Sequence, residues 1–122
     1  MTSMLTKDAA DAFAAEWIAA WNSHDLDRIL SHYSDDFEFS SPYIVQIVGE
    51  ASGVLRGKGA IREYWRRALE RLPDIQFALE SVLWSVNTVV INYRRNDGRL
   101  AAEWFEFGEG GLVVRSAGHY GA

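Results

Sequence analysis

The strand-like segment "EWFEF", which begins at Glu103, holds the residue best suited to acid–base chemistry. Successive side chains of a β-strand point to opposite faces, so Glu103 shares one face with Phe105 and Phe107, while Trp104 and Glu106 share the other. A carboxyl group held between aromatic rings loses contact with water, and desolvation raises its pKa. Glu103 is therefore a candidate acid, base or hydrogen-bond donor, although the alternation alone does not tell which face is buried.

Tyrosine hydroxyls are the best candidates to orient Glu103 or a ligand oxygen. We take Tyr33 and Tyr120 as candidate catalytic partners, and Tyr64 and Tyr93 as candidate ligand contacts. The alternative for each is a core tyrosine whose ring packs and whose hydroxyl is satisfied internally.

Large aromatic side chains would form the wall of a pocket. They are Trp17, Trp21, Phe37, Phe39, Trp65 and Phe105. Rings that face one cavity suit a small hydrophobic or aromatic ligand, and plain core packing is the alternative. Ser41, which precedes Pro42, is a further candidate ligand contact, or else a hydroxyl that caps a turn.

Metal and thiol chemistry is not expected. The chain has no cysteine, which excludes thiolate catalysis and cysteine-ligated zinc. His24, His32 and His119 do not stand at spacings that would place two histidines beside a carboxylate, so we predict no metal site and no cofactor.

Four arginines, Arg62, Arg66, Arg67 and Arg71, recur at helical spacings. Glutamates lie between them in the sequence, so we predict a solvated helix face rather than a site for an anionic ligand.

Length and charge bound the class of protein. With 122 residues the chain is predicted to be a single domain over residues 1–122. The net charge of −5 argues against a nucleic-acid or anionic-membrane partner. No segment has the length and apolarity of a membrane span or a secretory signal, so a cytoplasmic location is expected.

The elements that must position these residues follow from the spacing of apolar side chains. Helices are predicted at roughly 6–21, 26–33 and 58–72. Strands are predicted at about 36–41, 75–84, 87–95, 99–107 and 111–120, and residues 43–56 as an extended loop with some strand. Helices followed by a run of strands indicate the α+β class, with helices covering one face of a curved sheet.

Three segments, "AWNSHDLDRILSHYSDDFEFSSP", "LRGKGAIREYW" and "AEWFEFGEGGLVVRSAGHY", occur in this order. Together they resemble the SnoaL-like branch of the nuclear transport factor 2-like superfamily, which includes ketosteroid isomerases and polyketide cyclases. The resemblance covers essentially the whole chain. It implies a cone-shaped, curved antiparallel sheet whose concave face is covered by three N-terminal helices.

The resemblance also supplies the direction that periodicity lacks. Matching the last segment to the ketosteroid isomerases puts Glu103 where they keep the protonated acid of their pocket. The residues implied to face inward are then Glu103, Phe105, Phe107, Leu112, Val114, Ser116, Gly118 and Tyr120. Those implied to face outward, on a convex surface that often forms a homodimer, are Trp104, Glu106, Val113, Arg115 and His119.

Two other positions depart from that family. Trp17 stands where the isomerases have a tyrosine donor, and Ser41 stands where they have the aspartate base. A serine without a paired base does not take a proton from carbon at neutral pH, so ketosteroid isomerisation is not expected.

The sequence thus predicts a protein that binds a small hydrophobic or aromatic molecule in the cone. Cofactor-independent acid–base catalysis of the isomerase, cyclase or hydrolase type would centre on Glu103. The alternative is a non-catalytic module of the same fold that binds a ligand or a protein.

Overall fold

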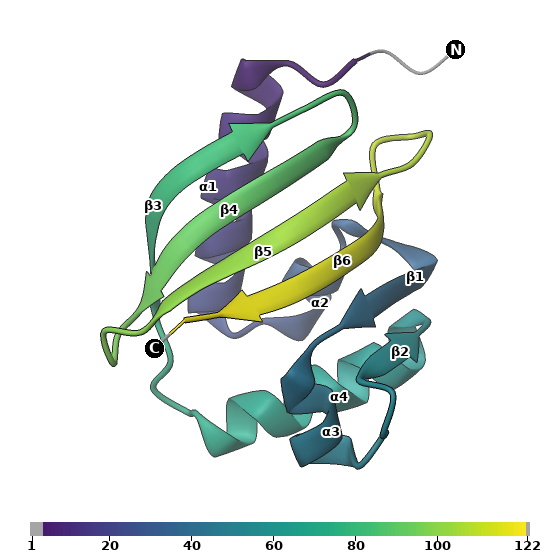
Figure 1. Cartoon of the computed structure of the whole chain (residues 1–122), viewed down its shortest axis with the longest axis vertical. Helices are drawn as coiled ribbons and strands as arrows, with labels where there is room; N and C mark the ends of the chain where they lie inside the picture. Colours follow the sequence, from purple (N-terminus) through teal and green to yellow (C-terminus); the bar gives the residue numbers. More distant parts are fainter. Residues whose placement is uncertain (1–3, 122) are drawn as a thin grey trace.

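A six-stranded curved sheet carries helices against one of its faces (Figure 1). The computed structural model describes residues 4–121. Its helices are α1 (Lys7–Ser23), α2 (Leu26–Leu30), α3 (Pro42–Val48) and α4 (Lys58–Arg71). Its strands are β1 (Tyr33–Ser40), β2 (Val54–Arg56), β3 (Phe77–Trp84), β4 (Thr88–Arg95), β5 (Leu100–Phe107) and β6 (Val113–Tyr120). The predicted α+β class is confirmed.

The strand order is β2-β1-β6-β5-β4-β3. Neighbouring strands are antiparallel except β1 and β6, which run parallel. The sheet is therefore mixed, where the sequence predicted an antiparallel one. The cause is the path of the chain, because α3, α4 and four further strands intervene before β6 returns to lie beside β1.

Helix α1 covers the concave face of the sheet. The Thr6 side chain caps it by accepting a hydrogen bond from the Ala9 amide at 3.1 Å, which satisfies one of the free donors at a helix start. The Trp17 ring, 2% exposed, lies 5.4 Å from the Phe105 ring and 5.2 Å from the Tyr93 ring between centroids. These edge-on ring contacts fix the helix over the middle of the sheet.

Helix α3 was not predicted, since residues 43–56 were expected to be extended. Its apolar run is rich in β-branched residues, which favours a strand reading. The local signals for a helix are nevertheless complete: the Ser41 hydroxyl caps the start, Pro42 occupies the first turn, and Gly49 ends the helix with a φ of 77°. The helix buries Ile44 against the core.

Tyr33 also differs from its predicted place in the second helix. That helix ends at Leu30, and Tyr33 is the first residue of β1, paired with Val113 of β6. Its side chain is fully buried in the core.

A β-bulge changes the predicted sides of β6. Phe107 pairs with Val113 and Glu106 with Arg115, so Val114 is the extra residue between the two pairs. Val113 is therefore buried, although alternation placed it on the outer surface. Leu112, predicted to face inward, is 41% exposed. Val114 was also predicted to face inward, but Val113 is the residue that points into the core.

Within the described part of the chain, no helix has the length and apolarity needed to cross a membrane.

Candidate functional site

A cavity of about 290 Å³ lies between the concave face of the sheet and the helices α1, α3 and α4. Aromatic rings from all these elements line it. They are Trp17, Trp21, Phe39, Tyr43, Tyr64, Trp65, Phe77, Tyr93 and Tyr120. Of the described residues that line the cavity, Glu103 is the one acid.

Glu103 sits in the middle of β5, directly opposite Ile91 on β4 and Gly118 on β6. It is 4% exposed and faces the concave side, as the resemblance implied. Burial raises the pKa of Glu103 to about 8, because the charged form loses its hydration. The carboxyl group is thus mostly protonated at neutral pH.

Ser116 gives the Glu103 carboxylate little support. The Ser116 hydroxyl donates to the Trp104 carbonyl at 2.9 Å, and it lies 3.5 Å from Glu103 Oε2. One hydroxyl has a single proton to donate, and the shorter contact is the stronger hydrogen bond. The weak second contact leaves desolvation as the dominant influence on the Glu103 carboxyl.

Tyr120 and Ser41 form a hydroxyl pair next to the cavity. Their oxygen atoms are 3.1 Å apart. Ser41 Oγ also accepts from the Tyr43 amide at 3.2 Å, so the serine joins the start of α3 to the end of β6. Burial raises the pKa of Tyr120, and the nearby Glu103 raises it further. Tyr120 is therefore a neutral donor at physiological pH and not a base.

Gly118 lets Glu103 and Tyr120 approach the same point of β6. A Cβ atom at this position would overlap the Tyr120 hydroxyl and lie 3.3 Å from Glu103 Oε1. The absent side chain is a packing requirement of the site, since any other residue would displace the phenol.

Two further tyrosines complete the polar surroundings of Glu103. Trp17 Nε1 donates to Tyr33 Oη at 3.1 Å in a buried hydrogen bond. Burial raises the pKa of Tyr33 well above its usual value, and it raises the pKa of Tyr64 to about 12. Every phenol near the carboxyl group stays neutral, so none of them neutralises Glu103 as a cation would.

The structure brings together eight of the residues proposed from the sequence. They are Glu103, Tyr120, Trp17, Trp21, Phe39, Tyr64, Trp65 and Tyr93, which all line the cavity. The other four, Tyr33, Phe37, Ser41 and Phe105, lie outside its lining. Tyr33 and Ser41 instead hold lining residues through the hydrogen bonds described above, and Phe37 and Phe105 are core rings.

Sequence reasoning missed Tyr43, Phe77, Arg95 and Arg99 of the lining. It named Arg71 but predicted a solvated helix face for it, whereas Arg71 also lines the cavity. Tyr43 was missed with helix α3. Arg95 stands two residues after Tyr93 in β4, so strand alternation carried the signal for an inward direction.

No group of three or more His, Asp and Glu side chains within residues 4–121 is arranged to hold a metal ion.

The other arginines of α4 behave as predicted for a solvated face: Arg66 pairs with Glu63 at 2.7 Å and Arg62 with Asp27 at 2.7 Å.

Comparison with known proteins extends these observations. Residues 14–116 match the family model described as SnoaL-like domain. A SnoaL-like protein of unknown function from Burkholderia thailandensis has a TM-score of 0.92 and 52% sequence identity, over 98% of this chain and 99% of its own. No curated protein sequence matches the chain.

Two more distant structures share the fold alone. An NTF2-like protein of unknown function from Cytophaga hutchinsonii has a TM-score of 0.69 and 14% identity, over 99% of this chain and 95% of its own. TerC, co-crystallized with polyporic acid, has a TM-score of 0.74 and 16% identity, over 92% of each chain. The nuclear transport factor 2-like architecture implied by the sequence is thereby confirmed.

Proposed function

Since the chain belongs to the SnoaL-like domain family, we propose that it binds a small, flat and largely apolar molecule in its cavity. We propose further that Glu103 acts on this molecule by acid–base chemistry without a cofactor. The observation that carries the proposal is a buried, weakly hydrogen-bonded carboxyl group on the wall of an aromatic cavity.

The cavity fits a ligand of modest size. Its volume of about 290 Å³ lies just below ~300 Å³, where the usual range for small-molecule sites begins. Aromatic walls favour a planar body, because stacked and edge-on ring contacts add to the area buried. The fold is compatible with such ligands, since the neighbour TerC was co-crystallized with polyporic acid.

The chemistry follows from the pKa of Glu103, which lies at about 8. A carboxyl group in this range gives a proton to a ligand oxygen and, once ionised, takes one from carbon or water. Isomerisation, cyclisation or hydrolysis by acid–base catalysis depends on such an exchange of protons. Tyr120, a neutral donor beside the carboxyl group, would hold the ligand oxygen during it.

A ligand screen with matched cavity variants tests binding. Steroids, polyketides and aromatic acids should include compounds that raise the melting temperature, and a ligand at a hundred times its Kd adds about 2.7 kcal/mol of stability. Ala68→Trp fills the cavity from α4 and should abolish the response, while Ala60→Trp, on the exposed part of the same helix, should keep it. A response that survives Ala68→Trp would place binding elsewhere and refute the proposal.

Glu103→Gln separates catalysis from simple binding. Glutamine keeps the shape and hydrogen-bonding capacity of the protonated carboxyl group but neither gives nor takes a proton. We expect this variant to bind the screened ligands and to lose turnover of them. Turnover that persists would rule out Glu103 as the acid–base group and favour the non-catalytic alternative for this cavity.

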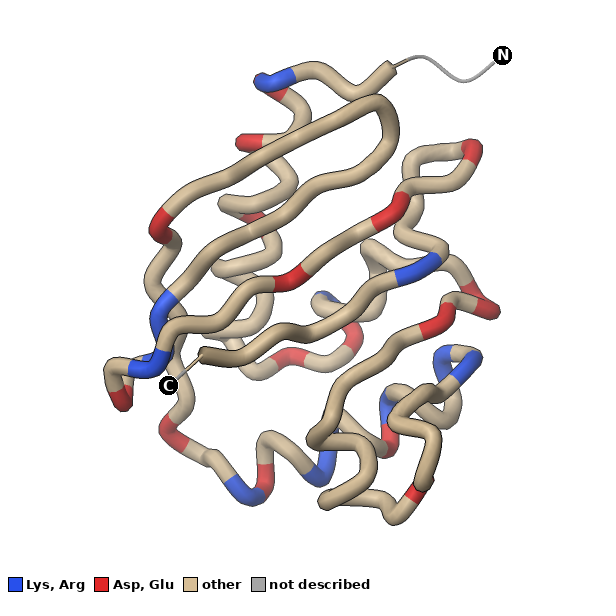
Figure 2. Tube along the Cα trace, viewed as in Figure 1, with Lys and Arg blue, Asp and Glu red and all other residues tan. Residues whose placement is uncertain are grey.

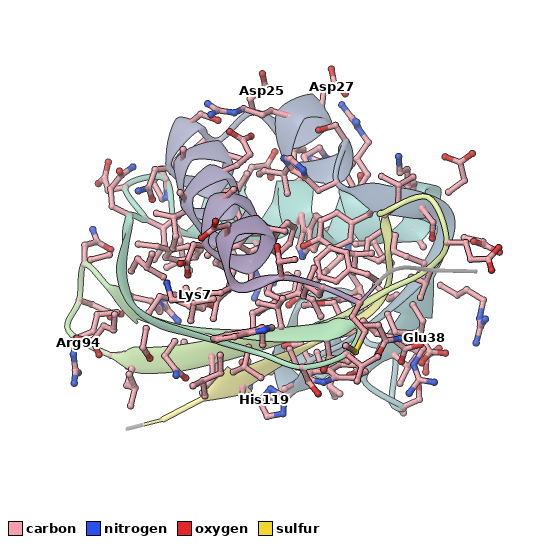
Figure 3. All side chains as sticks on the ribbon, turned by 90° about the horizontal axis from the view of Figure 1, so that it is seen from above. Lys7, Asp25, Asp27, Glu38, Arg94 and His119 are labelled. Atoms are coloured by element: carbon pink, nitrogen blue, oxygen red, sulfur yellow. The ribbon has the colours of Figure 1, made fainter. Side chains whose placement is uncertain are left out.

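We also propose that the outer face of the sheet joins two copies of the chain. Figure 3 shows His119 on the side of the sheet away from α1, where no other element covers it in the described chain. Trp104 lies on this face with the Arg115 guanidinium 5.8 Å above its ring. Sedimentation should show a dimer that Trp104→Glu dissociates and Trp84→Glu, at an exposed tryptophan of β3, leaves intact. A monomeric wild-type protein would refute this proposal.

A further inference from the structure

Two buried N–H groups at the cavity have no hydrogen-bond partner among residues 4–121. They are Trp21 Nε1 and Arg95 Nε, and both residues line the cavity. Buried donors are almost always paired, because an unpaired one loses its bond to water without replacement. Each of these two groups therefore needs a hydrogen-bond acceptor, and residues 4–121 do not supply one.

The two donors lie at the same end of the cavity. Arg95 ends β4 and lies directly opposite Phe77 of β3, and directly opposite residues share a face of the sheet. The Phe77 ring in turn contacts the Trp21 ring, with centroids 5.8 Å apart. Trp21 and Arg95 thus flank one phenylalanine of the cavity wall.

Arg95 is nearly buried, which is rare for an arginine side chain. Its side chain is only 9% exposed. Within residues 4–121 its one ion pair is with Asp97 in the turn after β4, at 3.5 Å, and that carboxylate is itself 44% exposed. A guanidinium has five donors, so one long contact leaves most of its capacity unused.

Positive charge gathers around this end of the cavity. Arg71, at the end of α4, and Arg99, in the turn between β4 and β5, also line it. Figure 2 shows basic positions gathered at that turn, with acidic colouring at its tip. Asp97 lies 3.8 Å from Arg99 as well, so a single carboxylate is shared between two guanidinium groups.

We propose that the natural ligand of the cavity is an anion: a flat aromatic acid whose carboxylate, phenolate or enolate oxygen accepts hydrogen bonds from Arg95 and Trp21. This inference rests on the proposed function and adds the chemical class of the ligand and its orientation. The anionic end lies between Arg95 and Trp21, and the aromatic body lies against Phe77 and Tyr93. The far end points toward Glu103.

Glu103 does not oppose an anion in this orientation. With its pKa raised to about 8 by burial, the carboxyl group is mostly uncharged at pH 7. The phenols that face it from other elements, Tyr33, Tyr93 and Tyr120, are neutral too. The arginines are then the dominant charges of the cavity, and they favour an oxyanion.

A pair of probes of equal shape tests the inference. 2-Naphthoate carries a carboxylate, and 2-naphthamide carries a neutral amide in its place. Calorimetric titration at pH 7 and fixed ionic strength should show that wild-type protein binds the acid roughly 10- to 100-fold more tightly, the range expected of a hydrogen bond to a charged group. Arg95→Met should abolish this preference, because it should weaken the binding of 2-naphthoate and leave the binding of 2-naphthamide unchanged.

Arg94→Met is the matched control. Arg94 is the neighbour of Arg95 in β4 but projects from the outer face of the sheet (Figure 3), where it pairs with Glu80 at 3.2 Å. We expect this variant to retain the full preference for the acid. Arg95→Lys, which keeps the charge but loses the planar fork, should fall between wild type and Arg95→Met.

The outcomes are distinct. Equal binding of acid and amide to wild-type protein would overturn the inference while leaving a ligand-binding cavity. If Arg95→Met still prefers the acid, Arg95 is not the residue that contacts the anion. The same conclusion follows if this variant binds neither probe. Binding of neither probe to wild-type protein would refute the proposed function, and the inference with it.

Discussion

Replacing Glu103 by glutamine should remove a pH dependence of folding stability that this carboxyl group creates. In the folded protein its pKa is raised from 4.5 to about 8 by burial. Between these two values the folded state keeps the proton while the unfolded chain has lost it. The unfolded state therefore binds fewer protons, and stability falls as the pH rises.

The size of the effect follows from the same shift. One proton difference changes the free energy of unfolding by roughly 1.4 kcal/mol per pH unit. Over the window from 4.5 to about 8 the loss from this one group amounts to about 5 kcal/mol. The contribution is fully present below pH 4.5 and is lost as the pH passes the folded pKa. A paired carboxylate, whose folded pKa is lowered, would give the opposite sign.

Urea unfolding at pH 5, 6, 7 and 8 measures the pH dependence of the free energy of unfolding. Wild type and Glu103→Gln are compared at one protein concentration. All other ionisable groups are common to both proteins, so their contributions to the pH dependence cancel in the difference. We expect the stability of the variant relative to wild type to increase steadily with pH. Parallel curves, or a difference that shrinks toward pH 8, would show that Glu103 is ionised in the folded protein and refute the reasoning.

Two further substitutions test the packing around the carboxyl group. Gly118→Ala should lower stability by about 1–3 kcal/mol, because the added methyl group overlaps the Tyr120 hydroxyl. The control is Gly59→Ala, where no atom lies within 4 Å of the added methyl group, and thermal unfolding compares the melting temperatures of the two variants. Equal melting temperatures for the two variants would contradict the close approach. Trp17→Phe should cost about 1–3 kcal/mol in chemical denaturation, because it removes the buried donor to Tyr33; Tyr33→Phe in the same background should then add little. A large additional loss would show that the two groups act independently.

The long helices were predictable from the sequence, and one short helix was not. Apolar spacing and caps located α1 and α4 within a few residues. In α3 the β-branched run outweighed the flanking signals of Ser41 and Gly49. Since β-branched residues favour strands only weakly, helix caps were the better guide there.

The site was predictable in part, for a physical reason. Alternation divided β5 into two faces, but both carried aromatic and acidic residues, so only the family resemblance assigned Glu103 to the inside. Arg95 was overlooked because arginine next to a turn is normally solvated, whereas here its side chain is only 9% exposed. The bulge at Val114 left no trace in the pattern of apolar residues, so the sides of Val113 and Val114 came out reversed.

That bulge also bears on how this protein can change in length. It separates the turn between β5 and β6 from the rows of paired residues that hold Glu103 opposite Gly118. A residue inserted or deleted in the turn shifts pairing only up to the bulge, where the chain already accommodates an unpaired residue. The same insertion within β5 would turn Glu103 outward and Trp104 into the cavity. Natural variation in length is therefore expected at the tip of this hairpin, and β5 itself is expected to keep its count of residues.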